Sequence, residues 1–198
     1  MSSNPRRLDT VCVYCGSSDT AAPVWLDAAA RFGAMLVKED LRLVYGGGGM
    51  GLMGACARAA HRAGGRVLGV IPGFLTQVEH TVPGVQTIVV TSMHERKARM
   101  FEESDAFVVL PGGIGTLEEA VEILSWRRLG VHAKPIVFYN PGGFWSPLFA
   151  IFAAFVDQNL APDWFGESWR SVETVEEILP AVRAMAAAPV HPAFGAPI

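Results

Sequence analysis

The chain has 198 residues, a size that suits one domain, and its 51% hydrophobic and 18% charged residues are typical of a globular protein. Its net charge of −3 provides no basic field that would draw it to nucleic acid or to an anionic membrane, so we expect neither partner. No apolar run reaches the roughly 18 residues of a spanning helix, and no secretory signal precedes the first expected strand, which favours a cytoplasmic location.

Short β-branched runs alternate with longer amphipathic stretches along the chain, which predicts strands and helices in turn. The expected strands cover residues 10–15, 42–45, 66–71, 85–90, 106–110 and 135–139. The expected helices cover residues 23–39, 51–63, 93–103, 117–128, 144–158 and 175–187. The Pro- and Ala-rich stretch at 189–198 and the first residues of the chain are expected to be loose.

Two of the expected strands, at 107–110 and 136–138, are apolar on both faces, which is typical of strands buried in a parallel sheet between helices. The alternation of strand and helix therefore predicts an α/β fold with a doubly wound parallel sheet. Because no repeat or linker-like change of composition interrupts the chain, one domain is expected to span residues 1–198, with its core at about 10–187. Ligands of such sheets bind beyond the carboxyl ends of the strands.

The spacing of cysteines and histidines predicts neither a disulfide framework nor a metal site. Cys12, Cys15 and Cys56 form an odd and sparse set, which favours free thiols in a reducing compartment. Cys12 and Cys15 have the spacing C-x-x-C, but residues three apart on a strand point to opposite faces. The histidines at positions 61, 80, 132 and 191 lack the spacing of ligands, so we expect them on the surface or in packing and expect no metal and no cofactor.

Three segments that follow expected strands are rich in Gly or Ser, at residues 15–18, 46–54 and 111–119. Glycine lets backbone N–H groups approach a phosphate, and a helix that starts there adds partial positive charge, so the loops predict a phosphorylated ligand; alternatively, they only form tight turns. The second loop contains G-x-G-x-x-G, but the next strand ends without the acid that a dinucleotide ribose requires, which disfavours NAD. A P-loop is excluded because no Lys-Ser/Thr pair has the required spacing.

Glu119 lies one turn beyond the third glycine loop and has two interpretations. Thr116 can cap the helix with Glu119 completing a capping box, which is the structural role expected for the same spacing at Thr174–Glu177 and at Ser92–Glu95. The alternative is a functional carboxylate, because Glu119 follows a glycine loop at the carboxyl end of a strand.

The surroundings of this helix support the functional alternative. Its core stripe is expected to be Leu117, Val121 and Leu124, which places Glu119, Glu122 and Trp126 on a face toward a ligand or a second subunit. The preceding helix opens with the charged run 94–99, which contains Arg96 and Lys97. Such a run is ordinarily a solvated surface, but its position after a strand favours binding of an anion, and the donor fork of Arg suits phosphate.

Taken together, these segments resemble the Lonely Guy family of cytokinin-activating phosphoribohydrolases, parts of which were labelled lysine decarboxylases. The main signature is Pro111-Gly-Gly-x-Gly-Thr-x-x-Glu119. Further matches are Cys-Gly-Ser-Ser at 15–18, Tyr-Gly-Gly-Gly at 45–48, Gly-Leu-Met-Gly at 51–54, Val-Ile-Pro at 70–72 with Glu79, Met-His-Glu-Arg-Lys-Ala at 93–98, Ser-Trp at 125–126 and Leu-Gly at 129–130. The resemblance covers about residues 11–160, and this combination of motifs is specific.

The resemblance implies a Rossmann-like fold, a homodimer with active sites near the interface, and a nucleoside 5′-monophosphate as substrate, cleaved to free base and ribose 5-phosphate. By matching positions, Arg96 and Glu119 are the expected catalytic pair. The expected nucleotide-contacting residues are Glu79, Lys97, Gly112, Gly113, Gly115, Thr116 and Glu118. The matched motifs add Ser17, Gly47, Gly48, Gly51, Met93 and Pro111 to the expected substrate-binding set.

Two other functions remain open. A nucleotide-binding or molybdenum-cofactor carrier of the same fold would keep the glycine loops but would not need the pair Arg96 and Glu119. A nucleic-acid processing factor is disfavoured by the acidic charge balance and by the lack of a basic stripe. The segment 73–83 matches the family less regularly, which leaves the choice between plain and prenylated adenine open.

Overall fold

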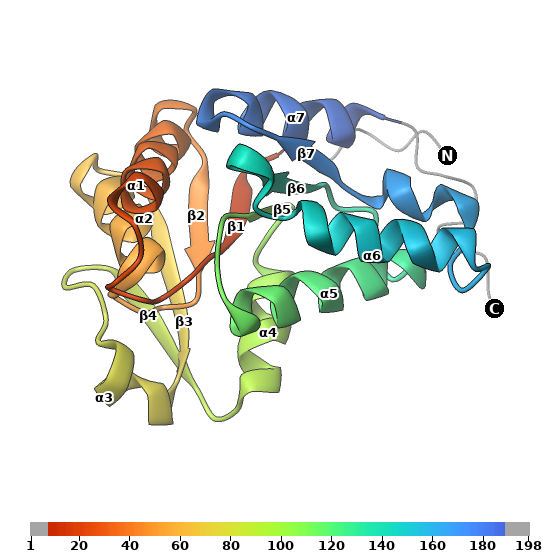
Figure 1. The fold of residues 1–198 in the computed structure, drawn as a ribbon. Coiled ribbons are helices and arrows are strands. Elements are labelled where there is room, and N and C mark those ends of the chain that lie inside the picture. Colours follow the sequence, from red (N-terminus) through yellow and green to blue (C-terminus); the bar gives the residue numbers. More distant parts are fainter. Residues whose placement is uncertain (1–7, 189–198) are drawn as a thin grey trace, which may run out of the picture.

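The computed structural model describes residues 8–188 and shows one parallel sheet of seven strands in the order β4-β3-β2-β1-β5-β6-β7 (Figure 1). The strands are β1 (Thr10–Tyr14), β2 (Arg42–Tyr45), β3 (Val67–Pro72), β4 (Gln86–Val90), β5 (Ala106–Val109), β6 (Ile136–Tyr139) and β7 (Arg170–Val172). The order runs outward from β1 in both directions, so the point of reversal lies between β1 and β5. The predicted α/β fold with a doubly wound parallel sheet is confirmed.

Seven α-helices are described, and three short 3-10 helices (η) connect some of them. The helices are α1 (Pro23–Lys38), α2 (Gly51–Arg62), α3 (Thr76–Glu79), α4 (Met93–Glu102), α5 (Ile114–Arg128), α6 (Ser146–Asp157) and α7 (Val175–Ala187). The short helices are η1 (Gly73–Leu75), η2 (Pro141–Gly143) and η3 (Asp163–Ser168). Among residues 8–188, no helix has the length and apolar character that crossing a membrane requires.

Side chains of the strands point alternately into two hydrophobic cores, one on each face of the sheet. Val11, Val13 and Cys15 of the first strand segment pack with α1, α2 and α7. Cys12 and Tyr14 pack on the other face with α4, α5 and α6 (Figure 1). The predicted separation of Cys12 and Cys15 is therefore confirmed, and all three cysteines are free and buried.

The twelve expected elements are present, with bounds within two residues except at the start of α5, which begins three residues early at Ile114. The sequence pattern missed β7 and α3, because they have only 3 and 4 residues and thus show no periodicity. His132 packs in the core, as expected, where its Nε2 lies 2.9 Å from the carbonyl oxygen of Ile123. The expectations for residues 1–7, 189–198 and His191 lie outside the described residues.

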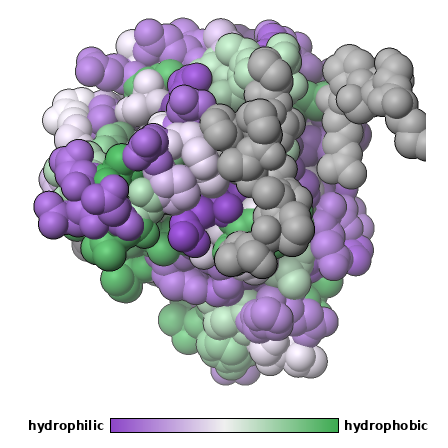
Figure 2. Space-filling view, turned by 90° about the vertical axis from the view of Figure 1, so that its right-hand side faces the viewer, coloured by the Kyte–Doolittle hydropathy of each residue, from purple (hydrophilic) through white to green (hydrophobic). Residues whose placement is uncertain are grey.

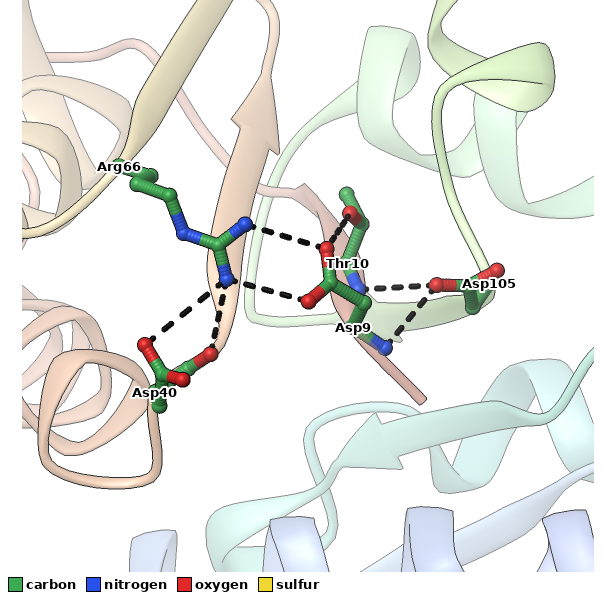
Figure 3. A network of polar contacts seen from close by, with 5 residues as sticks. All are labelled: Asp9, Thr10, Asp40, Arg66 and Asp105. Atoms are coloured by element: carbon green, nitrogen blue, oxygen red, sulfur yellow. Dashed lines mark hydrogen bonds and ion pairs between the residues drawn. The ribbon is translucent and has the colours of Figure 1, made fainter. Parts of the chain in front are cut away.

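A polar network joins three strands at the amino ends of the sheet (Figure 3). One carboxylate oxygen of Asp105 accepts hydrogen bonds from the backbone N–H groups of Asp9 (3.1 Å) and Thr10 (2.9 Å), which ties β1 to β5. Arg66, just before β3, donates two hydrogen bonds of 3.2 Å to the carboxylate of Asp9. The network thus fixes the amino ends of the strands. The glycine loops lie at the opposite, carboxyl ends.

Candidate active site

The three glycine loops meet where the strand order reverses. The N–H of Gly16, after β1, donates to the carbonyl oxygen of Pro111, after β5, at 3.1 Å. The carbonyl oxygen of Gly16 accepts from the N–H groups of Leu52 (2.9 Å) and Met53 (3.3 Å) at the start of α2. A Cβ atom on Gly16 would lie 3.3 Å from the Cα of Gly112, so the backbones pass as closely as the absence of side chains allows.

The start of α2 has its N–H groups already paired inside the protein. The carboxylate of Asp19 accepts from the N–H of Gly51 at 2.8 Å, and Gly16 takes the next two donors. The partial positive charge of this helix start is therefore matched by a carboxylate of the chain itself. Although its loop has the G-x-G-x-x-G spacing, the start of α2 does not offer a free anion site.

The start of α5 is open. Its N-cap is Gly113, no side chain caps it, and the first internal bond joins the N–H of Leu117 to the carbonyl oxygen of Gly113 at 3.0 Å. A Cβ atom on Gly113 or Gly115 would meet no other described atom within 4 Å. Because the first N–H groups of a helix have no partner within it, this glycine-lined start could hold an anion.

Of the two interpretations of Glu119, the capping box with Thr116 is wrong, because the N-cap of α5 is Gly113. Thr116 is the third residue of α5, and its hydroxyl packs against Gly112, where any Cβ atom would overlap with it. The same spacing does form a capping box at Thr174, whose N–H and hydroxyl both donate to Glu177 (3.0 and 2.9 Å). The two sites differ because the glycines before Thr116 let α5 begin earlier, which removes Thr116 from the cap position.

The core stripe expected on α5 is also partly wrong. Val121 is 42% exposed, whereas Glu119 lies on the buried face with Ala120, Ile123 and Leu124. Apolar spacing misled the expectation because two polar residues, Thr116 and Arg127, belong to the buried face. The carboxylate of Glu119 therefore points into the protein, toward α4.

Glu119 forms an ion pair with Arg96 of α4, with 2.9 Å between Oε1 and Nη1. The side chains are only 8% and 7% exposed, respectively. Arg96 is held from the other side by carbonyl oxygens at the ends of two strands, since its Nε donates to Val70 (3.2 Å) and its Nη2 to Gly46 (3.5 Å). The structure thus brings the two predicted catalytic residues together beside the open start of α5.

Burial has a strong effect on the acidity of this carboxyl group. Removal from water raises the pKa of Glu119 to about 7, although the positive charge of Arg96 acts in the opposite direction. A carboxyl group with a pKa near neutrality can change its protonation during a reaction cycle, which is a common property of catalytic acids and bases.

Lys97 does not lie at the open helix start. Its ammonium group pairs with Glu118 and, at 3.0 Å, with Glu122 along the outer face of α5. The cross-helix pair of Lys97 therefore lies beside that of Arg96 and Glu119. Three ion pairs, one of Arg96 and two of Lys97, join α4 to α5.

Glu79 reaches the second glycine loop from α3. Its Oε2 is buried without a hydrogen-bond partner among the described residues, and a Cβ atom on Gly48 would lie 2.7 Å from it. Gly47 has a φ of +81°, which favours glycine, and a Cβ atom on Gly51 would lie 2.5 Å from the backbone carbonyl carbon of Ser17. Met93 opens α4 and is 37% exposed.

Sequence reasoning missed Asp19, which closes the start of α2, and gave Glu122 no partner. Asp19 bonds to a residue 32 positions away, and a loop aspartate carries no local signal for such a contact. Among the described residues, no group of three or more His, Cys, Asp or Glu side chains could hold a metal ion.

Comparison with known proteins shows the family. Residues 53–182 match the family described as "Possible lysine decarboxylase". The probable cytokinin riboside 5′-monophosphate phosphoribohydrolase LOGL9 of Oryza sativa subsp. japonica is 48% identical, over 83% of this chain and 71% of its own. The phosphoribohydrolases LOG of the same plant and LOG5 of Arabidopsis thaliana are 42% and 46% identical, over 84% and 76% of this chain and 67% of each relative. The chain belongs to the Lonely Guy family.

Solved structures share the fold of this Lonely Guy protein at lower identity. The molybdenum cofactor carrier protein of Chlamydomonas reinhardtii has a TM-score of 0.70 at 22% identity and covers 92% of this chain and 100% of its own. The molybdenum cofactor binding protein of Rippkaea orientalis has a TM-score of 0.67 at 24% identity, over 91% and 98% of the two chains. At these identities the likeness concerns the fold alone.

Proposed function

We propose that this Lonely Guy protein hydrolyses the N-glycosidic bond of adenine-type nucleoside 5′-monophosphates, releasing the free base and ribose 5-phosphate. The observation that carries the proposal is the buried pair of Arg96 and Glu119, 2.9 Å apart, beside the open glycine-lined start of α5. Curated relatives at 42–48% identity are named as cytokinin riboside 5′-monophosphate phosphoribohydrolases. A carrier protein would have no use for this buried pair.

The 5′-phosphate binds at the start of α5 in this proposal. The free N–H groups there and the helix dipole favour a dianion, and Gly113 and Gly115 leave no side chain in its way. The loop that leads into α5 contains Pro111 and Gly112, and the hydroxyl of Thr116 packs against Gly112. This loop lies where the strand order reverses. Since the phosphate is bound through the backbone in this proposal, nucleosides without phosphate should be poor substrates.

Glu119 acts on C1′ of the ribose. The bond between C1′ and the base nitrogen breaks with its electron pair moving to the base, and C1′ gains positive charge as in glycoside hydrolysis. The ionised carboxylate stabilises that charge and orients the water whose oxygen adds to C1′, and the proton that this water loses is balanced by the one that the departing base gains. The sequence of the chain provides this carboxylate six residues after the helix N-cap, Gly113.

Arg96 keeps Glu119 in its reactive form and position. Its guanidinium pairs with the carboxylate and is itself held by the carbonyl oxygens of Val70 and Gly46, so that the carboxylate has a fixed partner before substrate enters. The positive charge of Arg96 also opposes protonation of Glu119, which burial favours. In this proposal the positive charge of Arg96 also stabilises the negative charge that develops on the leaving base.

The remaining predicted contacts surround this centre. We assign Glu79, whose buried Oε2 lacks a partner among the described residues, to the ribose or base, together with the loop residues around it. This set comprises Ser17, Gly47, Gly48, Gly51 and Met93. Lys97 and Glu118 complete the set on the phosphate side. The proposed mechanism uses no metal and no cofactor.

The proposal includes a homodimer in the cytoplasm. Apolar side chains are exposed on neighbouring helices, with Val121 of α5 at 42%, Ile151 of α6 at 51% and Phe155 of α6 at 40%. Figure 2 shows apolar residues reaching the surface in patches between hydrophilic ones on one side of the molecule. Apolar patches of this kind support a second copy as partner. The three free cysteines support a reducing compartment.

The deciding experiment is a chromatographic assay for free base. Purified protein is incubated with AMP and, separately, with isopentenyladenosine 5′-monophosphate, and the matching nucleosides are the controls. We expect base to be released from the monophosphates and not from the nucleosides, with the ratio of the two rates giving the base preference. Binding of AMP without any release of base would instead support a carrier.

A further inference from the structure

Two acidic residues of α5 hold the ammonium group of Lys97. Its Nζ lies 3.0 Å from Oε1 of Glu122 and also contacts Oε1 of Glu118. The side chain of Lys97 is only 12% exposed, against 23% for Glu122 and 52% for Glu118. Burial acts to lower the pKa of Lys97, but the hydrogen bonds to the two carboxylates outweigh it and raise that pKa. The ammonium group therefore stays charged.

This pairing draws Lys97 away from the open helix start. Glu118 and Glu122 follow Ile114, the first residue of α5, by four and eight residues. At the α-helical rise, their Cα atoms lie about 6 and 12 Å along the axis from that residue. Glu122 is therefore too far along the helix to contact a phosphate bound at its start. Its carboxylate can act on such a phosphate directly only through electrostatic repulsion. The only contact that could transmit an effect is the one with Lys97.

We propose that Glu122 is a positioning residue that competes with the 5′-phosphate of the substrate for Lys97. The proposal rests on the proposed function, which places the phosphate at the start of α5. A phosphate dianion is a stronger partner for an ammonium group than a carboxylate is. Because lysine has a flexible stem, its ammonium group can change partners by rotation of the side chain, and the neighbouring pair of Arg96 and Glu119 joins α4 to α5 independently of Lys97.

The competition has a consequence for the reaction cycle. Lys97 contributes to binding of the nucleotide only after it leaves Glu122. The free energy of breaking the ion pair with Glu122 therefore reduces the free energy that Lys97 adds to binding. The product ribose 5-phosphate carries the same phosphate and meets the same competition. Glu122 therefore weakens product binding and favours release.

The test is a double-mutant cycle on binding of ribose 5-phosphate, measured by isothermal titration calorimetry. The proteins are the wild type, Glu122→Gln, Lys97→Met, the double variant, and Glu102→Gln, which removes an exposed charge at the end of the same helix as Lys97. We expect Glu122→Gln to tighten binding on the order of threefold to tenfold, as a released, partly buried ion pair allows. In the Lys97→Met background, the same substitution should have no effect.

Three results would overturn the proposal. The first is weaker binding of ribose 5-phosphate by Glu122→Gln. The second is tighter binding that persists in the Lys97→Met background or appears equally in Glu102→Gln. The third is a lack of ribose 5-phosphate binding by any of the five proteins. The first two results would contradict the competition and not the proposed hydrolysis, because base release from AMP is measured separately. Conversely, a Lys97-dependent gain in a protein that releases no base would uphold the competition and contradict the proposed hydrolysis.

Discussion

At the scale of single residues, Glu119 combines three properties. It is buried, it is paired with Arg96 at 2.9 Å, and burial raises its pKa to about 7. Burying a charge is costly unless a partner compensates, and Arg96 is that partner for Glu119. The pair lies beside the open start of α5, so an anion bound there, as proposed, would lie close to it.

Glu119→Gln is expected to abolish turnover and to leave binding of AMP largely intact. The amide has the same shape and can still accept from Arg96, but it cannot stabilise positive charge at C1′. The rate constant should fall on the order of 10²- to 10⁴-fold, the usual effect of removing such a group. Assays of base release and calorimetric titration with AMP check the two parts. An equal loss of folded protein and of activity would support a structural role instead.

The activity should also depend on pH through Glu119. Because the pKa of its carboxyl group is raised to about 7, the group is protonated, and inactive as a charge stabiliser, below that pH. We therefore expect kcat/KM to rise with pH through about 7 and to level off above it. The control is binding of AMP to Glu119→Gln over the same range, which reports the ionisation of phosphate alone. A profile for kcat/KM that only parallels this control contradicts the assignment.

At the scale of elements, α2 and α5 both begin in glycine loops but have opposite roles. The start of α2 is closed by Asp19 at 2.8 Å and by Gly16, whereas the start of α5 is open. The tandem glycines before α2 permit the close approach of three backbones, and those before α5 leave room for a ligand. Similar loops thus give close packing in one place and an open helix start in the other.

Asp19→Ala should destabilise the protein by removing the acceptor at the start of α2. We expect the free energy of unfolding to fall by about 1 kcal/mol, the usual effect of losing a helix cap. Asp19→Asn is the matched variant, since its amide oxygen can still accept from Gly51, and it should lose much less. Urea unfolding followed by circular dichroism measures both. Equal losses in the two variants would show that charge, and not the hydrogen bond, matters.

At the scale of the whole molecule, one edge of the sheet is formed by the amino ends of the strands and the other by their carboxyl ends. The network of Asp9, Arg66 and Asp105 ties the amino ends of the strands, and the three glycine loops lie at the carboxyl ends. The apolar residues exposed on α5 and α6 belong to neither edge. They support the proposed contact with a second copy.

Replacing Ile151 and Phe155 together by glutamate should dissociate the proposed homodimer. Both side chains are exposed on α6, so the charges cost the isolated fold little but would be buried in an interface. Light scattering should give twice the chain mass of 21.2 kDa for the wild type and a single chain mass for the variant. Val24→Glu, on the exposed side of α1, is the control. A monomeric wild type, or a variant that remains dimeric, contradicts the assignment.

The sequence by itself determined the order of the twelve longer elements, the parallel sheet and the end of the sheet at which the glycine loops gather. These follow from local patterns: apolar periodicity marks strands and helices, and glycine-rich segments mark the strand ends that a parallel sheet gathers together. The family motifs also singled out Arg96 and Glu119.

Only the tertiary structure decided which glycine loop is open, that Glu119 is buried, and that Lys97 is paired with Glu118 and Glu122. Each of these depends on contacts between segments far apart in the chain, such as the bond from Gly51 to Asp19. Burial and charge pairing are properties of packing, and a one-dimensional pattern carries no record of which neighbour a side chain meets.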